Sequence, residues 1–287
     1  MSDPAAITGV SDTALWVATF RAEESNRSDA AFRDPLASRL AGQRGRKIAR
    51  HMAYRELMRW IMVMRTVGID QLLEAALADD VDTVVNLGAG LDTRPYRLPL
   101  PADLRWVEVD FPQIVDLKNH ALHGETPRCR LERRAVDLTR EEARRALLAD
   151  LGGSSRRILV ITEGVIPYLT NDEAGALSDD LRATPSVWGW IQDFNNTLSA
   201  ARRRGPRGWN RKMRAAPFRF EASPDWFSFF TARGWHVRSS MTALDVSRQL
   251  RRPLPGMGVG GLILRFMPEL REKIFRDISG AVLFTKG

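Results

Sequence analysis

The sequence predicts an α/β protein built on a doubly wound, mostly parallel sheet of seven strands. From Thr83 onward, short apolar runs alternate with helix-compatible segments, an alternation that is typical of parallel sheets. Before Thr83 the apolar residues recur at helical spacing instead. With 287 residues, 44% of them apolar and 27% charged, the chain has the composition of a soluble globular protein with one sizeable core.

Helices are expected through residues 1–80, ahead of the first strand. Ser11 is a candidate cap for a helix over SDTALWVATFRAEES, whose large apolar residues lie near helical spacing. In the following stretch, Gly42 predicts a helix stop. The segment YRELMRWIMVMRTVGIDQLLEAALADD predicts one long helix or two consecutive ones. These helices precede the sheet, and we expect them to form a lid region over it.

The strands and the turns between them predict a single domain over residues 1–287. The expected strands are VVNLGAG, LRWVEVDFP, RRAVDL, RRILVITEG, SVWGWIQDF, the stretch after a turn at Gly234, and AVLFTK. We expect a ligand-binding core over residues 81–194, a lid-like insertion at 195–222, and the C-terminal part of the sheet at 223–287. The insertion lies between elements of one sheet, so it is not a linker between domains.

Charge and cysteine content narrow the classes of function. The net charge of +8 is diffuse, and only residues 201–214, ARRRGPRGWNRKMR, concentrate arginine around an aromatic residue. A solvated loop or a lid over an acidic small molecule is favoured there over a nucleic-acid contact. The single Cys129 makes neither an internal disulfide nor a cysteine metal cluster, and no metal is expected. No secretion signal or membrane span is recognisable, so we expect a cytoplasmic protein.

The loop VVNLGAGLDTRPYRL departs from the fingerprint of dinucleotide-binding proteins. Gly88 and Gly90 have the G-x-G spacing that lets a backbone turn sharply beside a bulky ligand, but Thr93 stands where the third glycine belongs. A diphosphate cradle, and with it an NAD-dependent dehydrogenase, is therefore disfavoured. We expect Thr93 and Arg94 to hold the loop and its neighbouring segments.

Acidic residues close the next three predicted strands. Asp110 ends WVEVD about twenty residues after the glycines, where a carboxylate can accept hydrogen bonds from both hydroxyls of a ribose. Asp137 closes RRAVDL and could accept from an adenine amino group, with Leu138 offering backbone and apolar contact. Glu163 follows LVIT. In an open parallel sheet these ends meet at one edge, so we expect one ligand site there.

The same residues carry a family resemblance. TALWVATFRAEES, MRTVGIDQLL, VVNLGAGLDTRPYRL, WVEVDFPQIVDLK and ITEGVIPYLT resemble, in order, motifs of the leucine carboxyl methyltransferase family. The likeness is strongest to bacterial O-methyltransferases similar to the tetracenomycin polyketide methylase, and it covers most of residues 11–175. It implies a Rossmann-like class I methyltransferase fold and the cofactor S-adenosylmethionine.

The resemblance also implies a role for each site residue. Gly88 and Gly90 would form the glycine turn. Asp110 would bind the ribose of the cofactor, and Asp137 and Leu138 would contact its adenine. Glu163 would lie near the methionine end, where Arg65 would pair with the methionine carboxylate. A guanidinium suits that last role because its paired donors match a carboxylate.

Three classes of function stay open at the level of sequence. The leading one is an O-methyltransferase of a small molecule, acidic or aromatic and polyketide-like. The others are methylation of a protein's terminal carboxylate and a non-catalytic nucleotide- or nucleic-acid-binding role. A carboxylate acceptor, which needs no base, is favoured over a hydroxyl. No motif assigns a base among His51, His120, His123 and His236, and Tyr168, beyond Glu163, is the one weak catalytic candidate.

Overall fold

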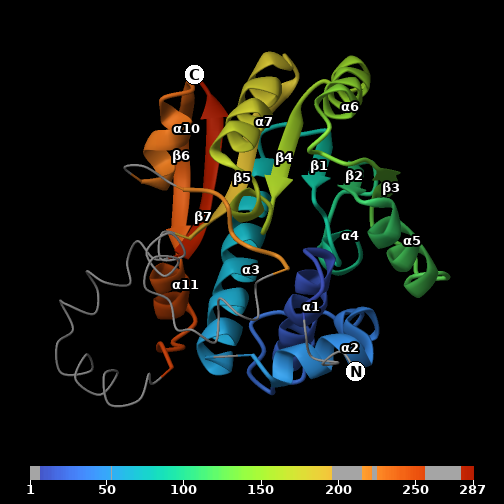
Figure 1. Cartoon of the computed structure of the whole chain (residues 1–287), viewed down its shortest axis with the longest axis vertical. Helices are drawn as coiled ribbons and strands as arrows, with labels where there is room; N and C mark the ends of the chain where they lie inside the picture. The colour runs from blue at the N-terminus through green and yellow to red at the C-terminus, as the bar shows by residue number, and fades with distance from the viewer. Residues whose placement is uncertain (1–6, 53, 196–214, 222–224, 256–278) are drawn as a thin grey trace.

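The computed structural model describes residues 7–52, 54–195, 215–221, 225–255 and 279–287 (Figure 1). The arginine-rich stretch 201–214 and most of the predicted insertion lie outside these residues, so the lid-like insertion stays a prediction.

A seven-stranded sheet is the centre of the described structure, as the sequence predicts. Its order is β3-β2-β1-β4-β5-β7-β6. The first five strands pair in parallel, and β7 runs antiparallel to both β5 and β6. The strands are β1 (Thr83–Leu87), β2 (Arg105–Asp110), β3 (Arg130–Ala135), β4 (Ile158–Thr162), β5 (Val187–Asn195), β6 (Trp235–Thr242) and β7 (Ser279–Lys286). The strand order reverses between β1 and β4, which makes their carboxyl ends the switch point.

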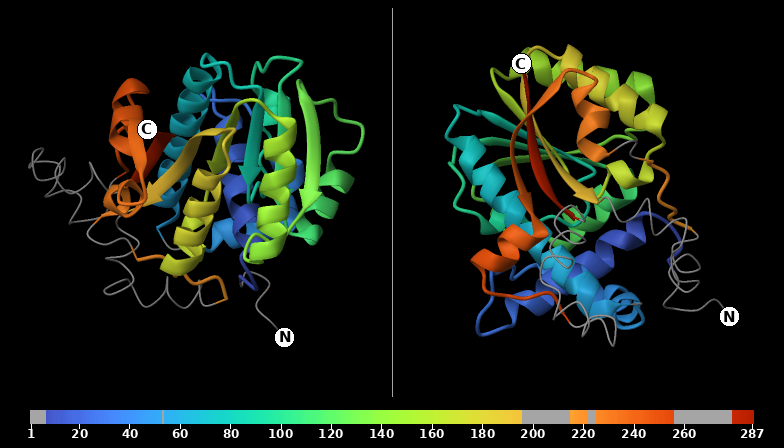
Figure 2. Two further views of the ribbon diagram at one scale, coloured as in Figure 1. Left: turned by 90° about the horizontal axis from the view of Figure 1, so that it is seen from above. Right: turned by 90° about the vertical axis from the view of Figure 1, so that its left-hand side faces the viewer.

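Helices cover both faces of the sheet and its carboxyl edge (Figure 2). They are α1 (Ser11–Ser25), α2 (Ala37–Arg50), α3 (Arg55–Leu77), α4 (Arg94–Arg97), α5 (Pro112–Ala121), α6 (Glu141–Ser154), the 3₁₀ helix η1 (Ile166–Tyr168), α7 (Asn171–Ala183), α10 (Trp226–Thr231) and α11 (Ala243–Gln249). Figure 1 shows α1 and α2 lying beyond the carboxyl ends of the parallel strands, where they cover the switch point of the sheet. Among the described helices, none combines the length and apolarity needed to cross a membrane.

Two apolar layers hold the sheet between its helices. Alternate strand residues point to opposite faces, so Val84 packs with α3 while its neighbour Val85 packs with α6, α7 and α10. All five residues of β1 and all five of β4 are buried. Strands buried on both faces read as continuous apolar runs, which is why these two were recognisable in the sequence.

The N-terminal helices follow the predicted segments but not all of the predicted signals. The first helix covers Ser11–Ser25, the whole predicted segment, yet Ser11 is not its cap: Val10 holds that position and makes no side-chain bond. The carboxylate of Asp12 instead accepts from the backbone N–H and hydroxyl of Thr8, both at 2.7 Å. Gly42 was predicted to end a helix. That prediction is confirmed: Gly42 has the non-helical angles φ 57° and ψ −167° and ends a first helical stretch, after which a second one runs to Arg50 within α2.

The third strand lies earlier in the sequence than predicted. It spans Arg130–Ala135, so Asp137 follows the strand by two residues and does not close it. It is an edge strand of the sheet and is rich in charged residues, because its half-exposed positions accept arginine and glutamate. The apolar run that was taken for the strand, around Val136 and Leu138, packs partly against the core instead.

Candidate active site

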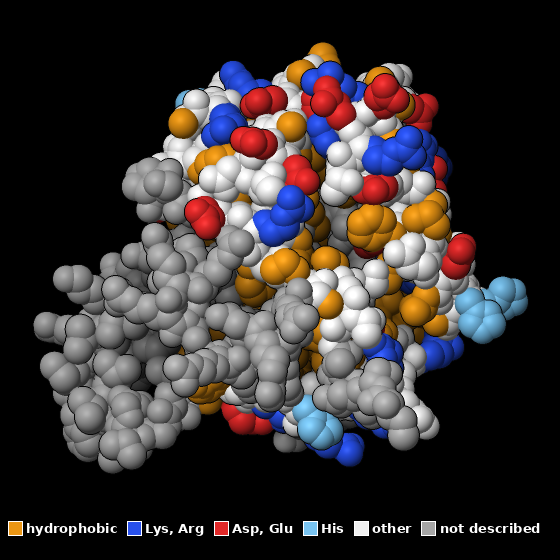
Figure 3. Space-filling model, in the orientation of Figure 1, with side chains coloured by type: hydrophobic (Ala, Val, Ile, Leu, Met, Phe, Trp, Pro, Cys, Tyr) orange, Lys and Arg blue, Asp and Glu red, His pale blue; other side chains and the backbone are white. Residues whose placement is uncertain are grey.

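A cavity of about 330 Å³ opens over the carboxyl ends of β1 and β4. It is of the size of small-molecule sites. Figure 3 shows this face hollowed near its middle, with hydrophobic side chains around the hollow. All the site residues named from the sequence line this cavity: Arg65, Gly88, Gly90, Asp110, Asp137, Leu138, Glu163 and Tyr168. The structure therefore brings together residues that lie more than a hundred positions apart in the chain.

The glycine turn after β1 is tight, and its backbone N–H groups are already hydrogen-bonded within the protein. Gly88 and Gly90 have φ of +68° and +47°, and a Cβ on Gly88 would lie 2.4 Å from a methyl carbon of Val165. The N–H groups of Gly88 and Ala89 donate to the carbonyl of Val109 at 2.8 and 3.1 Å, and that of Gly90 donates to the Asp110 carboxylate at 2.6 Å. A diphosphate is bound by free backbone amides. These three positions offer none.

Asp110 is held at the end of β2 with both oxygens oriented. Its Oδ2 accepts from Gly90 and its Oδ1 accepts from the backbone N–H of Phe111 at 2.7 Å. Each carboxylate oxygen takes about two hydrogen bonds, so each retains acceptor capacity. Burial raises the pKa of Asp110, although the amides of Gly90 and Phe111 act in the opposite direction.

Asp137 and Leu138 form a short turn at the far end of the cavity. Oδ1 of Asp137 accepts from the backbone N–H and hydroxyl of Thr139 at 3.0 and 2.7 Å. The carbonyl of Leu138 accepts from Arg144 at 2.9 Å. These contacts fix the turn, while both side chains stay half-buried along the cavity.

Arg65 and Glu163, predicted as separate contacts to a ligand, pair with each other. Arg65 Nη2 lies 2.9 Å from Glu163 Oε1, and Nη1 donates to Asp193 Oδ2 at 3.0 Å. Burial works to raise the pKa of Glu163, but the charges of Arg94 and Arg65 outweigh it and lower the pKa to about 2. The buried Nε of Arg65 has no hydrogen-bond partner among the described residues. One donor of this guanidinium is thus unused.

Arg94 is the centre of a buried acid–arginine cluster below the cavity. Its side chain is 2% exposed and reaches Asp70 at 2.7 Å, Asp92 at 2.9 Å and Glu163 at 2.7 Å. The cluster consists of Arg65, Arg94, Arg97, Asp70, Asp92, Glu163 and Asp193. Three guanidinium groups thus face four carboxylates, an excess of one negative charge.

Asp34 links the N-terminal helices to the glycine loop. Its buried Oδ2 accepts from Arg21 Nε at 2.9 Å and from the Thr93 hydroxyl at 2.7 Å. Arg21 also donates to the carbonyl of Leu91. Thr93 and Arg94 therefore hold the loop and its neighbours, as expected from the sequence, and α1 is tied to the same loop.

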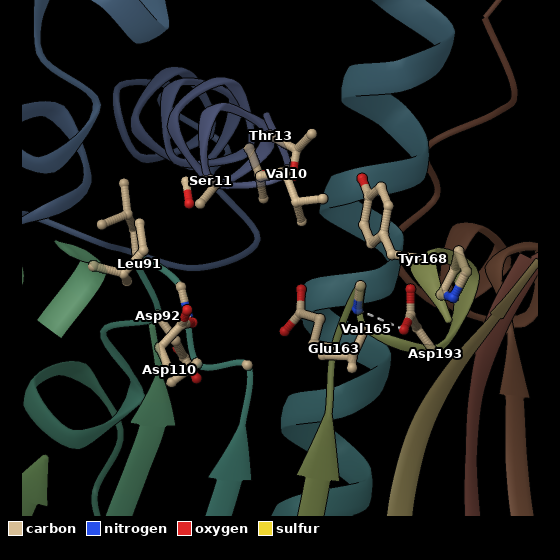
Figure 4. A pocket seen from close by; sticks show the side chains of 18 of the residues that line it. Val10, Ser11, Thr13, Leu91, Asp92, Asp110, Glu163, Val165, Tyr168 and Asp193 are labelled. Atoms are coloured by element: carbon tan, nitrogen blue, oxygen red, sulfur yellow. Dashed lines mark hydrogen bonds between the residues drawn. The ribbon is translucent and has the colours of Figure 1, made fainter. Parts of the chain in front are cut away.

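Asp193 was not predicted as a site residue from the sequence. This residue lies near the carboxyl end of β5, lines the cavity, and belongs to the acid–arginine cluster. The signal that pointed to Asp110 and Glu163, an acid at a strand end, is present in WIQDF as well. Figure 4 shows Asp110 and Asp193 at opposite sides of the cavity with Glu163 between them.

Tyr168 and the histidines differ in their access to the cavity. Burial raises the pKa of Tyr168 to about 12, while the Thr13 side chain that bonds to its hydroxyl lowers it less. Tyr168 is therefore protonated at neutral pH and is a hydrogen-bond donor, not a base. His51, His120, His123 and His236 are exposed, and none of them lines the cavity.

Comparison with solved structures supports the fold. A DUF574 family protein from Streptomyces avermitilis superimposes with a TM-score of 0.56 at 13% identity, over 94% of this chain and 97% of that one. A seven-stranded sheet in this order, with a cavity at its switch point, defines the class I methyltransferase fold.

The chain belongs to the leucine carboxyl methyltransferase family, whose model matches residues 14–182. A protein of Parafrankia sp. is 34% identical over 88% of this chain and 85% of its own length. One from Mycobacterium tuberculosis strain H37Ra is 31% identical over 86% of each chain. Both relatives carry the provisional name of S-adenosyl-L-methionine-dependent methyltransferase.

Proposed function

We propose that this protein transfers a methyl group from S-adenosylmethionine to a carboxylate or hydroxyl oxygen of a small molecule, within one domain. The cofactor and the methyltransferase class agree with the family and with the names of its relatives. The observation that carries the proposal is the geometry of Asp110: an oriented carboxylate at the switch point, beside a glycine turn whose amides are already bonded. That arrangement suits a ribose and not a diphosphate.

The residues along the cavity fit the parts of this cofactor. Asp110 would hold the ribose hydroxyls, and Asp137 with Leu138 would contact the adenine. Arg65, with an unused buried Nε, and Glu163 would hold the methionine end. S-adenosylmethionine carries two positive charges and one negative at neutral pH, so the negative excess of the acid–arginine cluster complements it.

The protein's contribution to such a reaction is to position the acceptor and exclude water. The bound cofactor supplies an activated methyl group on a sulfonium. Val10, Thr13 and Val17 of the N-terminal region form one wall of the cavity, and Tyr168 and Phe218 form another. Alignment of the reacting groups is the main catalytic requirement for this chemistry. The resemblance to polyketide methylases supports a secondary metabolite as the acceptor.

Replacing Asp110 with alanine should weaken binding of S-adenosylhomocysteine by about 1.5–3 kcal/mol, the range for hydrogen bonds to a charged group. Isothermal titration calorimetry on the folded variant measures this. Asp116→Ala is the matched control, because Asp116 is an exposed carboxylate on the neighbouring helix α5 and lies outside the cavity lining. Unchanged affinity in Asp110→Ala, or tighter binding of NAD than of S-adenosylhomocysteine, would refute the cofactor assignment.

Arg65→Ala should weaken binding of S-adenosylhomocysteine about tenfold or more, and Arg65→Lys less, because lysine keeps the charge and loses the forked donors. The alanine variant also leaves Glu163 and Asp193 without this cation, so the melting temperature should fall in parallel. Arg59→Ala, on the same helix but outside the cavity lining, is the control. Equal affinity for S-adenosylhomocysteine in the alanine and lysine variants would contradict a contact between the forked Arg65 guanidinium and the cofactor.

A further inference from the structure

The acceptor half of the cavity lies on the β5 side of Glu163. If the cofactor extends from Asp110 to Arg65 and Glu163, Asp193 and Tyr168 lie beyond Glu163 (Figure 4), in a cavity that is also lined by apolar residues. These apolar residues are Trp16, Val17, Met58, Met62, Pro167 and Phe218. An apolar body of aromatic size suits this lining.

Asp193 is rigidly oriented in this half and keeps acceptor capacity. Its Oδ1 accepts from the backbone N–H of Gly164 at 2.7 Å, and its Oδ2 accepts from Arg65 at 3.0 Å. Its side chain is 6% exposed. Each oxygen therefore has room for one further donor, such as an acceptor hydroxyl.

The charges around Asp193 disfavour an anionic acceptor. The cluster has one more carboxylate than guanidinium groups, and the bound cofactor would only balance this excess. A further carboxylate about 4 Å from Asp193 would be repelled by roughly 1–4 kcal/mol, depending on the local dielectric. A neutral hydroxyl avoids this repulsion, but it needs a base.

The other titratable groups near the acceptor half are poor bases. The histidines do not line the cavity, Tyr168 is protonated at neutral pH, and the low pKa of Glu163 makes its carboxylate weakly basic. Asp193 differs, because burial raises its pKa. Of the groups that face it, Glu163 adds to that rise, while Arg65 and the Gly164 amide lower the pKa. Tyr168 faces the same space as a neutral donor.

We propose that Asp193 is the general base for a neutral hydroxyl acceptor on an apolar, aromatic-sized molecule. This inference rests on the proposed methyl transfer. The acceptor oxygen forms the new bond to the methyl carbon as its proton passes to Asp193. The carbon–sulfur bond breaks with its electron pair going to sulfur, which leaves a methyl ether, S-adenosylhomocysteine and a protonated Asp193 that returns its proton to solvent. This proposal differs from the sequence-based expectation, which favoured a carboxylate acceptor.

The first test uses 2-naphthol and 2-naphthoate, which share one ring system and differ in the proposed reacting group. Calorimetry at pH 8, with the full chain saturated by S-adenosylhomocysteine, should show tighter binding of 2-naphthol. Asp193→Asn should shift the preference toward 2-naphthoate by about tenfold, since it removes one negative charge. Asp179→Asn, an exposed carboxylate on α7, should leave the preference unchanged. A wild-type preference for 2-naphthoate, or binding of neither compound, would overturn the inference.

The second test is single-turnover methylation of 2-naphthol between pH 6 and 9, followed by mass spectrometry. Asp193→Asn should lose at least about a hundredfold in rate, the scale of general base catalysis, and this loss should far exceed any change in affinity for S-adenosylhomocysteine. Asp193→Glu, which keeps a carboxylate in place, should recover part of the wild-type rate. A variant rate near wild type, no methylation of 2-naphthol by the wild type, or a main defect in S-adenosylhomocysteine binding would overturn the role as base. Failure of the wild type to bind S-adenosylhomocysteine at all would instead refute the proposed function.

Discussion

Replacing Arg94 with alanine is expected to lower the free energy of unfolding by about 3–5 kcal/mol at pH 7, the usual cost of removing one partner from a buried ion pair. The guanidinium contacts Asp70, Asp92 and Glu163, and its removal leaves these carboxylates buried with less positive charge. Urea denaturation measures the loss. Arg39→Ala is the control, because Arg39 is 45% exposed in a surface pair with Glu125 and should contribute about 1 kcal/mol or less.

The effect of Arg94→Ala should shrink in acid. Glu163 has a folded pKa of about 2 against an ordinary value of 4.5, so the stability it contributes is present above pH 4.5 and is lost as pH falls toward 2. Without Arg94 the pKa of Glu163 in the folded protein rises. The ionised Glu163 then contributes less to the free energy of unfolding, so acid removes less stability from the variant than from the wild type. The stability difference between wild type and variant should therefore narrow between about pH 5 and pH 3. An equal difference at pH 7 and pH 3 would contradict a charge-based role for Arg94.

Deleting residues 1–22 is expected to abolish methyl transfer while the sheet stays folded. The deleted segment supplies one wall of the cavity through Val10, Thr13 and Val17, and without it water reaches the site and the acceptor loses its alignment. Methyl transfer to any acceptor identified by screening measures the loss, and far-UV circular dichroism reports the sheet.

The truncation needs one compensating change. It removes Arg21, which leaves the Thr93 hydroxyl and the Ala37 amide as the partners of the buried Asp34 carboxylate among the described residues. Adding Asp34→Asn removes that unpaired charge, so a truncated Asp34→Asn protein should be more stable than the simple truncation and equally inactive. Full activity in either protein would show that α1 serves packing alone.

Most of the strands were predictable because they carry a local signal. Runs such as TVVNL and ILVIT are mostly apolar, and the glycines at 88 and 234 fall where the backbone requires a positive φ. The cavity was predictable for the same reason, since strand ends that carry acids meet at one edge of a parallel sheet. Local pattern and topology together were enough to place Asp110 and Glu163.

The sequence could not predict which side chains pair with one another when they lie far apart along the chain. Arg65 and Glu163 are 98 positions apart, and no local pattern shows that they pair with each other. Ser11 lies inside the first helix, because the helix begins one residue earlier than the predicted cap implies and Val10 holds the cap position. Asp137 was misplaced because β3 is a charged edge strand without an apolar run. For Arg65 and Glu163 the deciding contact joins distant residues, and for β3 exposure at a sheet edge overrode the local signal.

The position of β7 sets the order in which the sheet can be assembled during synthesis. β6 leaves the ribosome well before β7, yet its only partner in the described sheet is β7, which lies between it and β5. Until Ser279–Lys286 has been translated, β5 is an open edge and β6 has nothing to join. The nascent chain can therefore form the parallel strands β1 to β5, whose carboxyl ends carry the cavity, before β7 has been synthesised and can pair with β5 and β6. The strand that completes the sheet closes an edge that would otherwise be free to pair with other chains.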